Sequence, residues 1–512
     1  MPSASIAKER SNMKKKSYIW KRLIRSLASI FVIMVVVFVM VYSLVPRENI
    51  FFNDGTYSKL GGKPDEKRDY VMRTWQKLGY LDYQTINTYC EDLYGAGSDK
   101  MSACIIAESQ ESQDFKQHYE DLGYTVESLQ VSKQLYAYKD VPLAKRLLLW
   151  FKDLIVIDHP WKIQDPNNPD LERYIKFART ETGGLAIRGS GTYHKYLIYT
   201  DTNFPYIHQN IITLNMGTSY PTYQGLDVLD VIFNYQGTDV KRTVTYETGL
   251  TGESAIIFGT LTYKYNLDRM DTQKFVDNYA EGHYLREQQS MIGISFLMGI
   301  FSLVLAYAIG LPVGLLMAKH KDHLIDKLGM VYIIFIIAVP SLAYIYVFRY
   351  LGTKFFGLPT VFPTLGAGDI RSWILPIVSL ALPSISSLML WTRRYVVDQM
   401  NSDYVKFAKA KGLNQSEIFR THIFKNAIIP IAQGIPSSLA GCIMGAIITE
   451  SIYSVGGMGK MLPDATKQYN NVMVIALTFI FSSISVLSVL LGDLVLTWVD
   501  PRIQLTEKEG RS

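Results

Sequence analysis

Three ionisable side chains lie within or beside long apolar stretches of this sequence. Arg349 and Glu450 are near the ends of two such stretches, and Asp493 is inside a third. Charged groups are costly in hydrocarbon, so in a membrane they face a cavity or a partner helix, or a long arginine side chain reaches the interface with water. Their chemistry is therefore hydrogen bonding and ion pairing. We predict that Glu450 and Asp493 line a pathway and that Arg349 reaches the interface.

The residues that could perform covalent catalysis lack the spacing that it requires. Gly189-Ser190-Gly191 is not the Gly-x-Ser-x-Gly turn of a serine hydrolase, and no HExxH occurs. His159, His194 and His208 have no recognisable nucleophile as partner. A membrane-anchored sensor or ectoenzyme is the alternative class of protein, and it would place its activity in the polar middle of the chain.

Nucleotide binding also lacks its motif. A phosphate-binding loop has the pattern Gly-x-x-x-x-Gly-Lys-Ser/Thr, and the segment 456–461 fails in spacing and in its final residue. We therefore expect this chain to bind no cofactor itself, ATP included.

The three cysteines are Cys90, Cys104 and Cys442. None has a CxxC partner or a nearby histidine cluster, so we expect no metal site. Cys442 falls in an apolar stretch, which leaves Cys90 and Cys104, 14 residues apart, as the pair that could form a disulfide. The alternative is that both are buried thiols.

The composition indicates a protein that is partly in a membrane and partly in water. Hydrophobic residues make up 48% of the 512 positions and charged residues 19%, and the uncharged runs cluster at the N-terminus and in the last 220 or so positions. The net charge of +6 does not indicate nucleic-acid binding, because membrane proteins concentrate lysine and arginine on cytoplasmic loops.

The first apolar run covers residues 26–46 and is long enough to cross about 30 Å of hydrocarbon. A cleaved signal peptide is the alternative, but no small-x-small cleavage site precedes Arg47. Basic residues precede the run and place the N-terminus in the cytoplasm: they are Lys8, Arg10, Lys14, Lys15, Lys16, Lys21, Arg22 and Arg25. Residues 1–46 therefore form a basic cytoplasmic end and a first membrane helix.

Five further spans are predicted within 287–500, at about 291–317, 329–350, 372–391, 427–453 and 472–499. Six spans place both termini in the cytoplasm and leave 501–512 as a cytoplasmic tail. The predicted inner loops carry more lysine and arginine than the predicted outer loops, which agrees with this topology. The fold class is thus a polytopic α-helical membrane protein with six transmembrane helices.

The segment 47–286 is polar and rich in tyrosine, aspartate, asparagine and glycine. It contains alternating stretches at 195–199 and 243–246 that are typical of strands. At about 240 residues it can form its own core. We predict an α+β domain inserted between the first two helices, and the position of the first helix places it outside the cell.

The predicted cytoplasmic loop 393–426 is long for a connection between helices. Its residues around Tyr404 and Ala408 have helical spacing, Gly412 can end that helix in a left-handed conformation, and Asn414 with Glu417 resembles a capping box. This pattern predicts a helix, a sharp turn and a second short helix. The loop could dock another protein, or it could rest as an amphipathic helix on anionic lipid.

This loop resembles the EAA loop of binding-protein-dependent ABC permeases. The matching residues are Tyr404, Ala408, Ala410, Lys411 and Gly412, followed by 426–430. In that family the short helix sits in a groove of the ATPase. The resemblance implies that the ATPase-coupling residues are Tyr404, Ala408, Ala410, Lys411, Gly412, Asn414, Glu417, Phe419, Arg420 and His422. Lys406 and Phe407 depart from the general EAA consensus, which has Glu and Ala there.

The resemblance extends to both ends of the chain and points to the B-type subunit of the oligopeptide, dipeptide and nickel subfamily. The segments 18–23, 215–220, 450–462 and 493–503 carry it. It implies the type I importer permease fold and a gate at Gly456, Gly457 and Gly459, for which an ordinary re-entrant turn is the alternative. The large insertion, mainly 51–210 and 233–279, is similar to the Ami-type oligopeptide permeases of Gram-positive bacteria.

The family resemblance also implies the partners. They are a second, C-type permease subunit, two ABC ATPases that bind ATP and magnesium, and an extracytoplasmic substrate-binding lipoprotein. Membrane lipid is expected around the chain, and nucleic acid is not. Oligopeptide import is the implied function, and dipeptide or nickel import are the alternatives. We expect the inserted domain to dock the binding protein or cover the entrance, and a passive spacer is the alternative.

Overall fold

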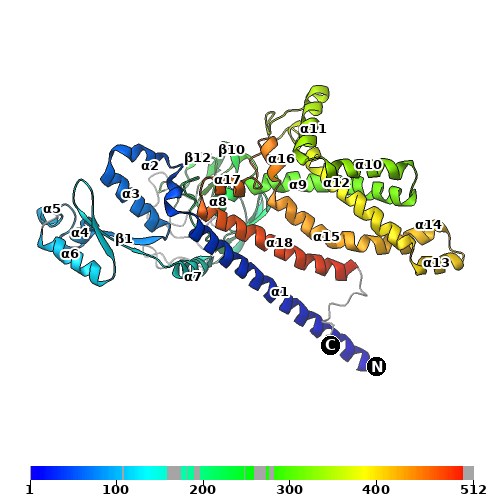
Figure 1. Ribbon diagram of the computed structural model, residues 1–512, viewed down its shortest axis with the longest axis horizontal. Coiled ribbons are helices and arrows are strands. Elements are labelled where there is room, and N and C mark those ends of the chain that lie inside the picture. Colours follow the sequence, from blue (N-terminus) through cyan, green and yellow to red (C-terminus); the bar gives the residue numbers. More distant parts are fainter. Residues whose placement is uncertain are drawn as a thin grey trace.

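The computed structural model describes residues 2–106, 109–157, 174–180, 183–189, 196–246, 248–258, 272–275 and 282–499, with side chains of the first helix described from Trp20 onward. His159, His194, Ser190, Gly191 and the predicted tail 501–512 lie outside these ranges. The molecule is elongated (Figure 1). A lobe with α4, α5 and α6 occupies one end, the long helices follow, and α13 and α14 occupy the other end.

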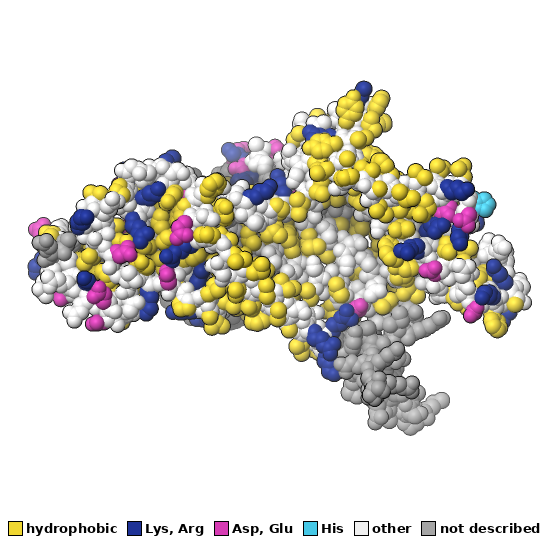
Figure 2. Space-filling view, viewed as in Figure 1, with side chains coloured by type: hydrophobic (Ala, Val, Ile, Leu, Met, Phe, Trp, Pro, Cys, Tyr) yellow, Lys and Arg dark blue, Asp and Glu magenta, His cyan; other side chains and the backbone are white. Residues whose placement is uncertain are grey.

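The long helices are α1 (Pro2–Leu44), α9 (Met291–Lys319), α12 (Arg371–Met400), α15 (Phe424–Met444) and α18 (Asn471–Val499). In the described part of the chain, five stretches are long and apolar enough to cross a membrane: Trp20–Leu44, Met291–Lys319, Arg371–Met400, Gln415–Ile452 and Asn471–Val499. A sixth arises when the bent pair α10 (Leu324–Ala338) and α11 (Ser341–Phe356) is counted as one span. Figure 2 shows hydrophobic side chains over much of the helical surface and charged ones gathered toward the α13–α14 end.

Glycines bring α9 and α12 close together. Gly310 and Gly314 lie four residues apart on one face of α9, and a Cβ on either would come within 3.0 Å of α12 atoms, including the carbonyl oxygens of Ile385 and Met389. In lipid the hydrophobic effect does not drive two helices together, so van der Waals packing must hold them. Small residues allow the close approach that such packing needs.

Two of the predicted spans are interrupted. The span predicted at 329–350 is not one straight helix, because α10 and α11 meet at an angle of 112° around Pro340. Val339 has φ −89° and ψ 130°, the extended conformation that a following proline imposes on its neighbour. The stretch predicted at 427–453 breaks after Met444, where Gly445 has φ 77° and ψ 177°, a region that is essentially restricted to glycine.

The inserted domain begins with a lobe that has its own core. Its helices are α2 (Gly55–Lys59), α3 (Pro64–Lys77), α4 (Ile86–Tyr94), α5 (Asp99–Cys104) and α6 (Gln110–Asp121). Its antiparallel sheet has the order β1 (Leu81–Thr85), β3 (Leu135–Asp140), β2 (Thr125–Ser128), with Thr85 opposite Tyr136. Short 3-10 turns at Arg47–Phe51 and Leu60–Gly62 complete it.

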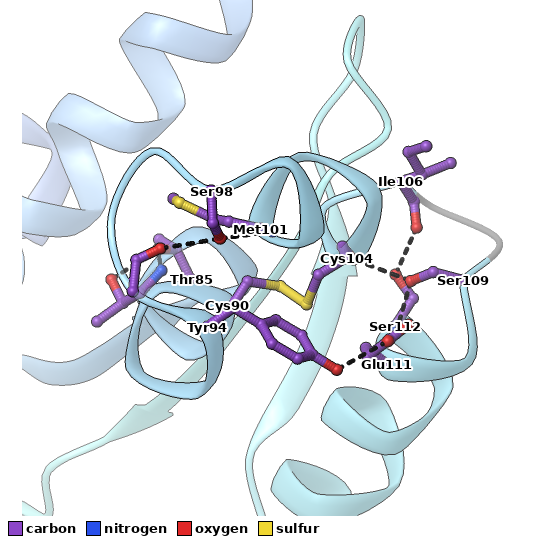
Figure 3. The surroundings of a disulfide bond; sticks show 12 residues. Thr85, Cys90, Tyr94, Ser98, Met101, Cys104, Ile106, Ser109, Glu111 and Ser112 are labelled. Carbon is purple, nitrogen blue, oxygen red and sulfur yellow. Dashed lines mark hydrogen bonds between the residues drawn. A yellow bond between two sulfur atoms is a disulfide. The ribbon is translucent and has the colours of Figure 1, made fainter.

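A disulfide ties α4 to α5 in this lobe (Figure 3). It joins Cys90 and Cys104, which are buried with Ile86 and Phe115. Beside it, Tyr94 donates to Glu111 at 3.1 Å and Ser109 donates to the carbonyl oxygen of Cys104 at 2.9 Å. Because α4 and α5 are short, the disulfide and these two hydrogen bonds help to hold them in place.

The rest of the domain is built from small antiparallel sheets. One has the order β5 (Ile175–Arg179), β6 (Leu185–Gly189), β7 (Tyr196–Thr200), β8 (Ile207–Gln209). Two-stranded sheets pair β4 (Ile155–Ile157) with β9 (Ile212–Leu214), β10 (Gln236–Asp239) with β15 (Arg286–Gln288), β11 (Arg242–Thr245) with β12 (Thr251–Ser254), and β13 (Ile256–Phe258) with β14 (Gly282–Tyr284). The helices are α7 (Leu143–Asp153) and α8 (Val228–Phe233). The strands predicted at 195–199 and 243–246 are present as β7 and β11.

The domain is fastened to the ends of two long helices by buried amides. Asn203 accepts hydrogen bonds from the backbone and hydroxyl of Ser290, which caps α9, at 3.0 and 2.9 Å. At the start of α18, Asn470 donates to Ser219 at 2.8 Å and Asn471 donates to Tyr80 at 3.0 Å. Apolar residues of both parts also share one core, which includes Met216, Val228, Ile292 and Met473. The domain thus packs against the starts of both α9 and α18.

A buried carboxylate links the segment 215–220 to the lobe. Asp54 caps α2 and accepts hydrogen bonds from the hydroxyls of Tyr70, at 2.6 Å, and Tyr220. Burial opposes ionisation, but the two tyrosine hydroxyls and the backbone amides of the cap hold the pKa of Asp54 below its usual range. Asp54 therefore stays ionised and stabilises this junction at neutral pH.

Candidate functional site

A groove of about 300 Å³ lies among α9, α12, α15 and the short helix α16 (Ile447–Ile452). We call it the serine-lined groove. Hydroxyl-bearing side chains line it: Ser302, Tyr307, Ser384, Ser387, Ser438 and Thr449. Apolar side chains such as Met298 and Leu380 complete its wall, and Glu450 lies at one end.

Glu450 is buried at the end of this groove, with 3% of its surface exposed. Its carboxylate accepts hydrogen bonds from the hydroxyl of Ser295 at 2.7 Å, the backbone N–H of Ala446 at 3.1 Å and that of Lys460 at 3.2 Å. The Ser295 hydroxyl in turn accepts from the backbone N–H of Met458 at 2.7 Å. A charged acceptor with this many donors is strongly held. Glu450 therefore organises the loop that follows it.

The glycines after Glu450 are needed because the loop closes tightly around the carboxylate. A Cβ on Gly457 would lie 2.5 Å from the carboxyl carbon of Glu450, and one on Gly459 would lie 2.7 Å from the backbone nitrogen of Ala446. A Cβ on Gly445 would lie 2.5 Å from a carboxylate oxygen. We call this arrangement of residues 445–460 the Glu450 clasp. The structure thus brings Glu450 and the predicted glycines together.

The inserted domain and α11 both touch the clasp. Gln236, on β10, donates to the carbonyl oxygen of Gly456 at 2.8 Å. Arg349, on α11, donates to the carbonyl oxygen of Ile452 at 3.2 Å, at the carboxyl end of α16. A cation there complements the helix dipole. Arg349 has this protein partner, and its predicted reach to the interface with water stays a prediction. Neither contact was predicted, because the partners are far apart in sequence.

Asp493 lies at a different place from Glu450. It forms an ion pair with Arg22 of α1 and accepts from Gln433 of α15 at 3.4 Å. None of these residues is among those that line the serine-lined groove. The two acidic residues predicted to line one pathway therefore have separate surroundings, and Asp493 joins three helices to each other.

At the other end of the long helices, the predicted helix and turn are both present. α13 (Asp403–Ala410) ends in a Schellman motif, in which Leu413 donates to the carbonyl of Ala408 at 3.3 Å and Gly412 to that of Lys409 at 2.9 Å. Gly412 has φ 77°, as predicted, and nothing lies within 4 Å of the place that its Cβ would occupy. Backbone angle alone therefore requires glycine here.

The second short helix is α14 (Gln415–Ile418), and it continues through a π-helical turn at Phe419–Ile423 into α15. Asn414 caps it by accepting from the backbone N–H of Ser416 at 2.9 Å. Val405, Ala408, Ile418 and other apolar residues pack onto α9 and α12 residues, which fixes the direction of the loop. It is thus built on the long helices and does not hang free.

The predicted coupling residues divide into two groups. Ala410, Lys411, Gly412, Asn414, Glu417 and Arg420 are exposed, and Ala408, Tyr404, Phe419 and His422 are buried or half-buried. Tyr404 donates to Gln399 at 2.7 Å and lies beside the His422 ring. The first group forms a surface, and the second holds it in place.

Two features of this end escaped the sequence analysis. The Phe407 side chain is 71% exposed on α13, and its departure from the EAA consensus was the available signal for it. Arg393 donates two hydrogen bonds to the buried Asp326, at 2.5 and 2.7 Å, and so ties α12 to the start of α10. No local pattern could have paired residues 67 positions apart.

Comparison with known proteins places these features in context. The family described as "Binding-protein-dependent transport system inner membrane component" matches residues 310–505. The chain is 40% identical over 503 residues to the oligopeptide transport system permease protein AmiC of Streptococcus pneumoniae, covering 97% of this chain and 100% of that protein. It is 28% identical over 213 residues to the dipeptide transport system permease protein DppB of Lactococcus lactis, covering 41% of this chain and 69% of that one.

Among solved structures, one of the MetNI methionine ABC transporter in inward facing conformations aligns with a TM-score of 0.33 and 14% identity, over 41% of this chain and 94% of that one. The alignment with AmiC spans nearly all of this chain, so it includes most of the inserted domain as well as the long helices.

Proposed function

This chain belongs to the binding-protein-dependent transport system inner membrane components, and from that premise we propose that it is the permease subunit of an importer for oligopeptides. The observation that carries the proposal is the 40% identity with AmiC over 97% of the chain, inserted domain included. Dipeptide import has less support, because the identity with DppB is 28% and covers 41% of the chain.

The chain is a multi-pass membrane protein, and we propose that it crosses the membrane six times with both termini in the cytoplasm. Counting α10 and α11 as one bent span supports this number. The inserted domain is then extracytoplasmic. Two observations support that side: the Cys90–Cys104 disulfide is of a kind that persists in oxidising compartments, and the lobe lies at the opposite end of the molecule from α13 and α14 (Figure 1).

The proposal assigns ATP hydrolysis to partner ATPases, which bind ATP and magnesium. The exposed group on α13 and α14, together with Phe407, is the surface that they contact. A second permease subunit completes the pathway, and an external binding protein delivers the peptide. Because α9, α12, α15 and the coupling surface share packed residues, movement at the ATPase contact can reach the groove through rigid helices.

Growth of a leucine auxotroph tests the substrate. The gene for this chain is deleted, and the strain is given leucine free, in dipeptides or in peptides of four to six residues, with and without the restored gene. We expect restored growth on the longer peptides and equal growth on free leucine. Rescue confined to dipeptides, or a requirement for this chain in nickel uptake without one for peptides, would refute oligopeptide import.

The lobe with α4, α5 and α6 allows a clean test of the domain's role. Because Thr85 of β1 lies opposite Tyr136 of β3, residues 86–135 can be replaced by Asn-Gly to give a two-residue hairpin. The contacts of Asn203 with Ser290, of Asn470 with Ser219 and of Asn471 with Tyr80 involve no residue of the replaced segment. If the domain docks the binding protein, the shortened chain binds it more weakly and shows a higher apparent KM with an intact ATPase cycle. Unchanged uptake at limiting peptide would show that the lobe is only a passive spacer.

A further inference from the structure

The serine-lined groove offers hydroxyl groups from four helices to one space. α9 provides Ser302 and Tyr307, α12 provides Ser384 and Ser387, α15 provides Ser438, and α16 provides Thr449. Ser302 is buried, with 3% of its surface exposed, whereas Ser387 is exposed. The hydroxyls therefore continue from the interior of the helices to the surface at α12, as they would along one wall of a passage.

Charge is almost absent from this wall. Among the described residues that line it, Glu450 alone is a charged side chain, and its oxygens already accept hydrogen bonds from Ser295, Ala446 and Lys460. The Cys442 thiol donates to the carbonyl of Ser438 at 3.3 Å. The Ser438 hydroxyl donates to the carbonyl of Gly434 at 3.1 Å and can still accept, and the side-chain polar capacity that remains for a ligand consists of neutral hydroxyls.

We propose that the serine-lined groove is this chain's half of the pathway and that its hydroxyls bind the main chain of the peptide, with little regard to the peptide's side chains. A hydroxyl both donates and accepts, so one serine can serve either a peptide N–H or a peptide C=O. The apolar part of the wall includes Met298, whose flexible side chain adapts to varied neighbours. This inference rests on the proposed function and specifies how its site treats the substrate.

Energetics favour the same assignment. A neutral hydrogen bond contributes little net free energy, because the same groups bond to water when the peptide is free, so a few of them hold a moving peptide without trapping it. A fixed charge in the wall would retain peptides of opposite charge and exclude those of like charge. A transition-metal ion would need imidazole, thiolate or carboxylate ligands, and hydroxyls are poor substitutes. At about 300 Å³ the groove is at the lower end of the range for small-molecule pockets, which suits one wall of a passage shared with a second permease.

The test removes hydroxyls from the exposed part of the wall. Ser384→Ala with Ser387→Ala is compared with the wild type in the complete importer, with uptake measured for three radiolabelled peptides that are rich in lysine, glutamate or leucine. We expect the maximal uptake rate to fall about fivefold for all three, as the loss of about 1 kcal/mol predicts. The KM should not change, because the binding protein captures the peptide.

Controls separate this effect from misfolding and from failure of the proposed function. Ser485→Ala, whose hydroxyl faces Met444 at 3.6 Å outside the groove, should transport like the wild type. The double Ser→Thr variant keeps both hydroxyls and should retain most uptake, whereas a folding defect would persist in it. Wild-type uptake by the double alanine variant, or a loss confined to one class of peptide, would overturn main-chain binding. A wild type that imports no peptide would instead refute the proposed function.

Discussion

Two glycine-containing turns, one at each end of the long helices, differ in what requires the glycine. In the Glu450 clasp a Cβ on Gly457 would lie 2.5 Å from the carboxyl carbon of Glu450, so a side chain there would have to displace the carboxylate. At Gly412 nothing lies within 4 Å, and the positive φ of 77° is the whole requirement. The first turn is tightly packed against Glu450, and the second is open to solvent.

This difference indicates what each turn is for. Polar groups of the clasp are satisfied within this chain, by Glu450 of the clasp itself and by Ser295 and Gln236 packed against it, and so its conformation needs no other subunit. The turn at Gly412 is fixed in direction but leaves Phe407 and Lys411 exposed, and so it suits contact with another protein. Substitutions at the clasp should therefore act on stability, and those at the open turn on assembly.

The largest effect on stability is expected for Gly457→Ala. The new methyl group must displace the carboxylate or the loop, and overpacking of this kind costs about 1–3 kcal/mol. We expect a lower Tm for the purified protein in detergent. Gly434→Ala is the matched control, since a Cβ at that helical position meets nothing within 4 Å and should not lower the Tm. Equal Tm values for the two variants would show that the clasp is loose.

Gly412→Val should impair assembly with the ATPases rather than the stability of the chain. A β-branched residue in the left-handed region costs about 1–2 kcal/mol, concentrated at an exposed turn. We expect the chain to be inserted at normal abundance, with the ATPases no longer retained when it is purified and with peptide uptake lost. If the variant retains its ATPases and transports at the wild-type rate, the assignment of this turn to coupling is wrong.

Gln236→Ala tests whether the inserted domain stabilises the clasp. It leaves the carbonyl of Gly456 without this donor, and a lost hydrogen bond of this kind costs about 0.5–1.5 kcal/mol. The Tm should fall by less than in Gly457→Ala, and uptake should persist. Gln224→Ala, on the same domain and bonded instead to Tyr70, serves as control for uptake. If Gln224→Ala and Gln236→Ala have the same Tm and the same uptake, the clasp does not depend on the contact.

The smallest effect on stability is expected for Phe407→Ser. An exposed side chain contributes within about 0.5 kcal/mol, so the Tm of the isolated chain should not change. Binding of the ATPases, measured by titration onto the permease pair in nanodiscs, should weaken about tenfold, as is usual for a buried aromatic contact at an interface. An unchanged affinity would remove Phe407 from the coupling surface.

Local features of the chain could be predicted because their causes are local. The turn after α13 depends on Gly412 and its neighbours, and the strands β7 and β11 follow from alternation within five residues. The break at Pro340 was also within reach, since a proline constrains the residue before it, but hydropathy summed over a window does not register one bond angle.

The sequence by itself determined the apolar spans, the basic N-terminal end, the polar insertion and the turn at Gly412, because each follows from composition or from residues a few positions apart. Only the tertiary structure decided which groups satisfy the buried charges. Glu450 is bonded to Ser295, 155 positions away, and Asp493 is paired with Arg22. A buried charge must find its partner wherever the packing of helices places one, and that packing depends on contacts along the whole length of the chain.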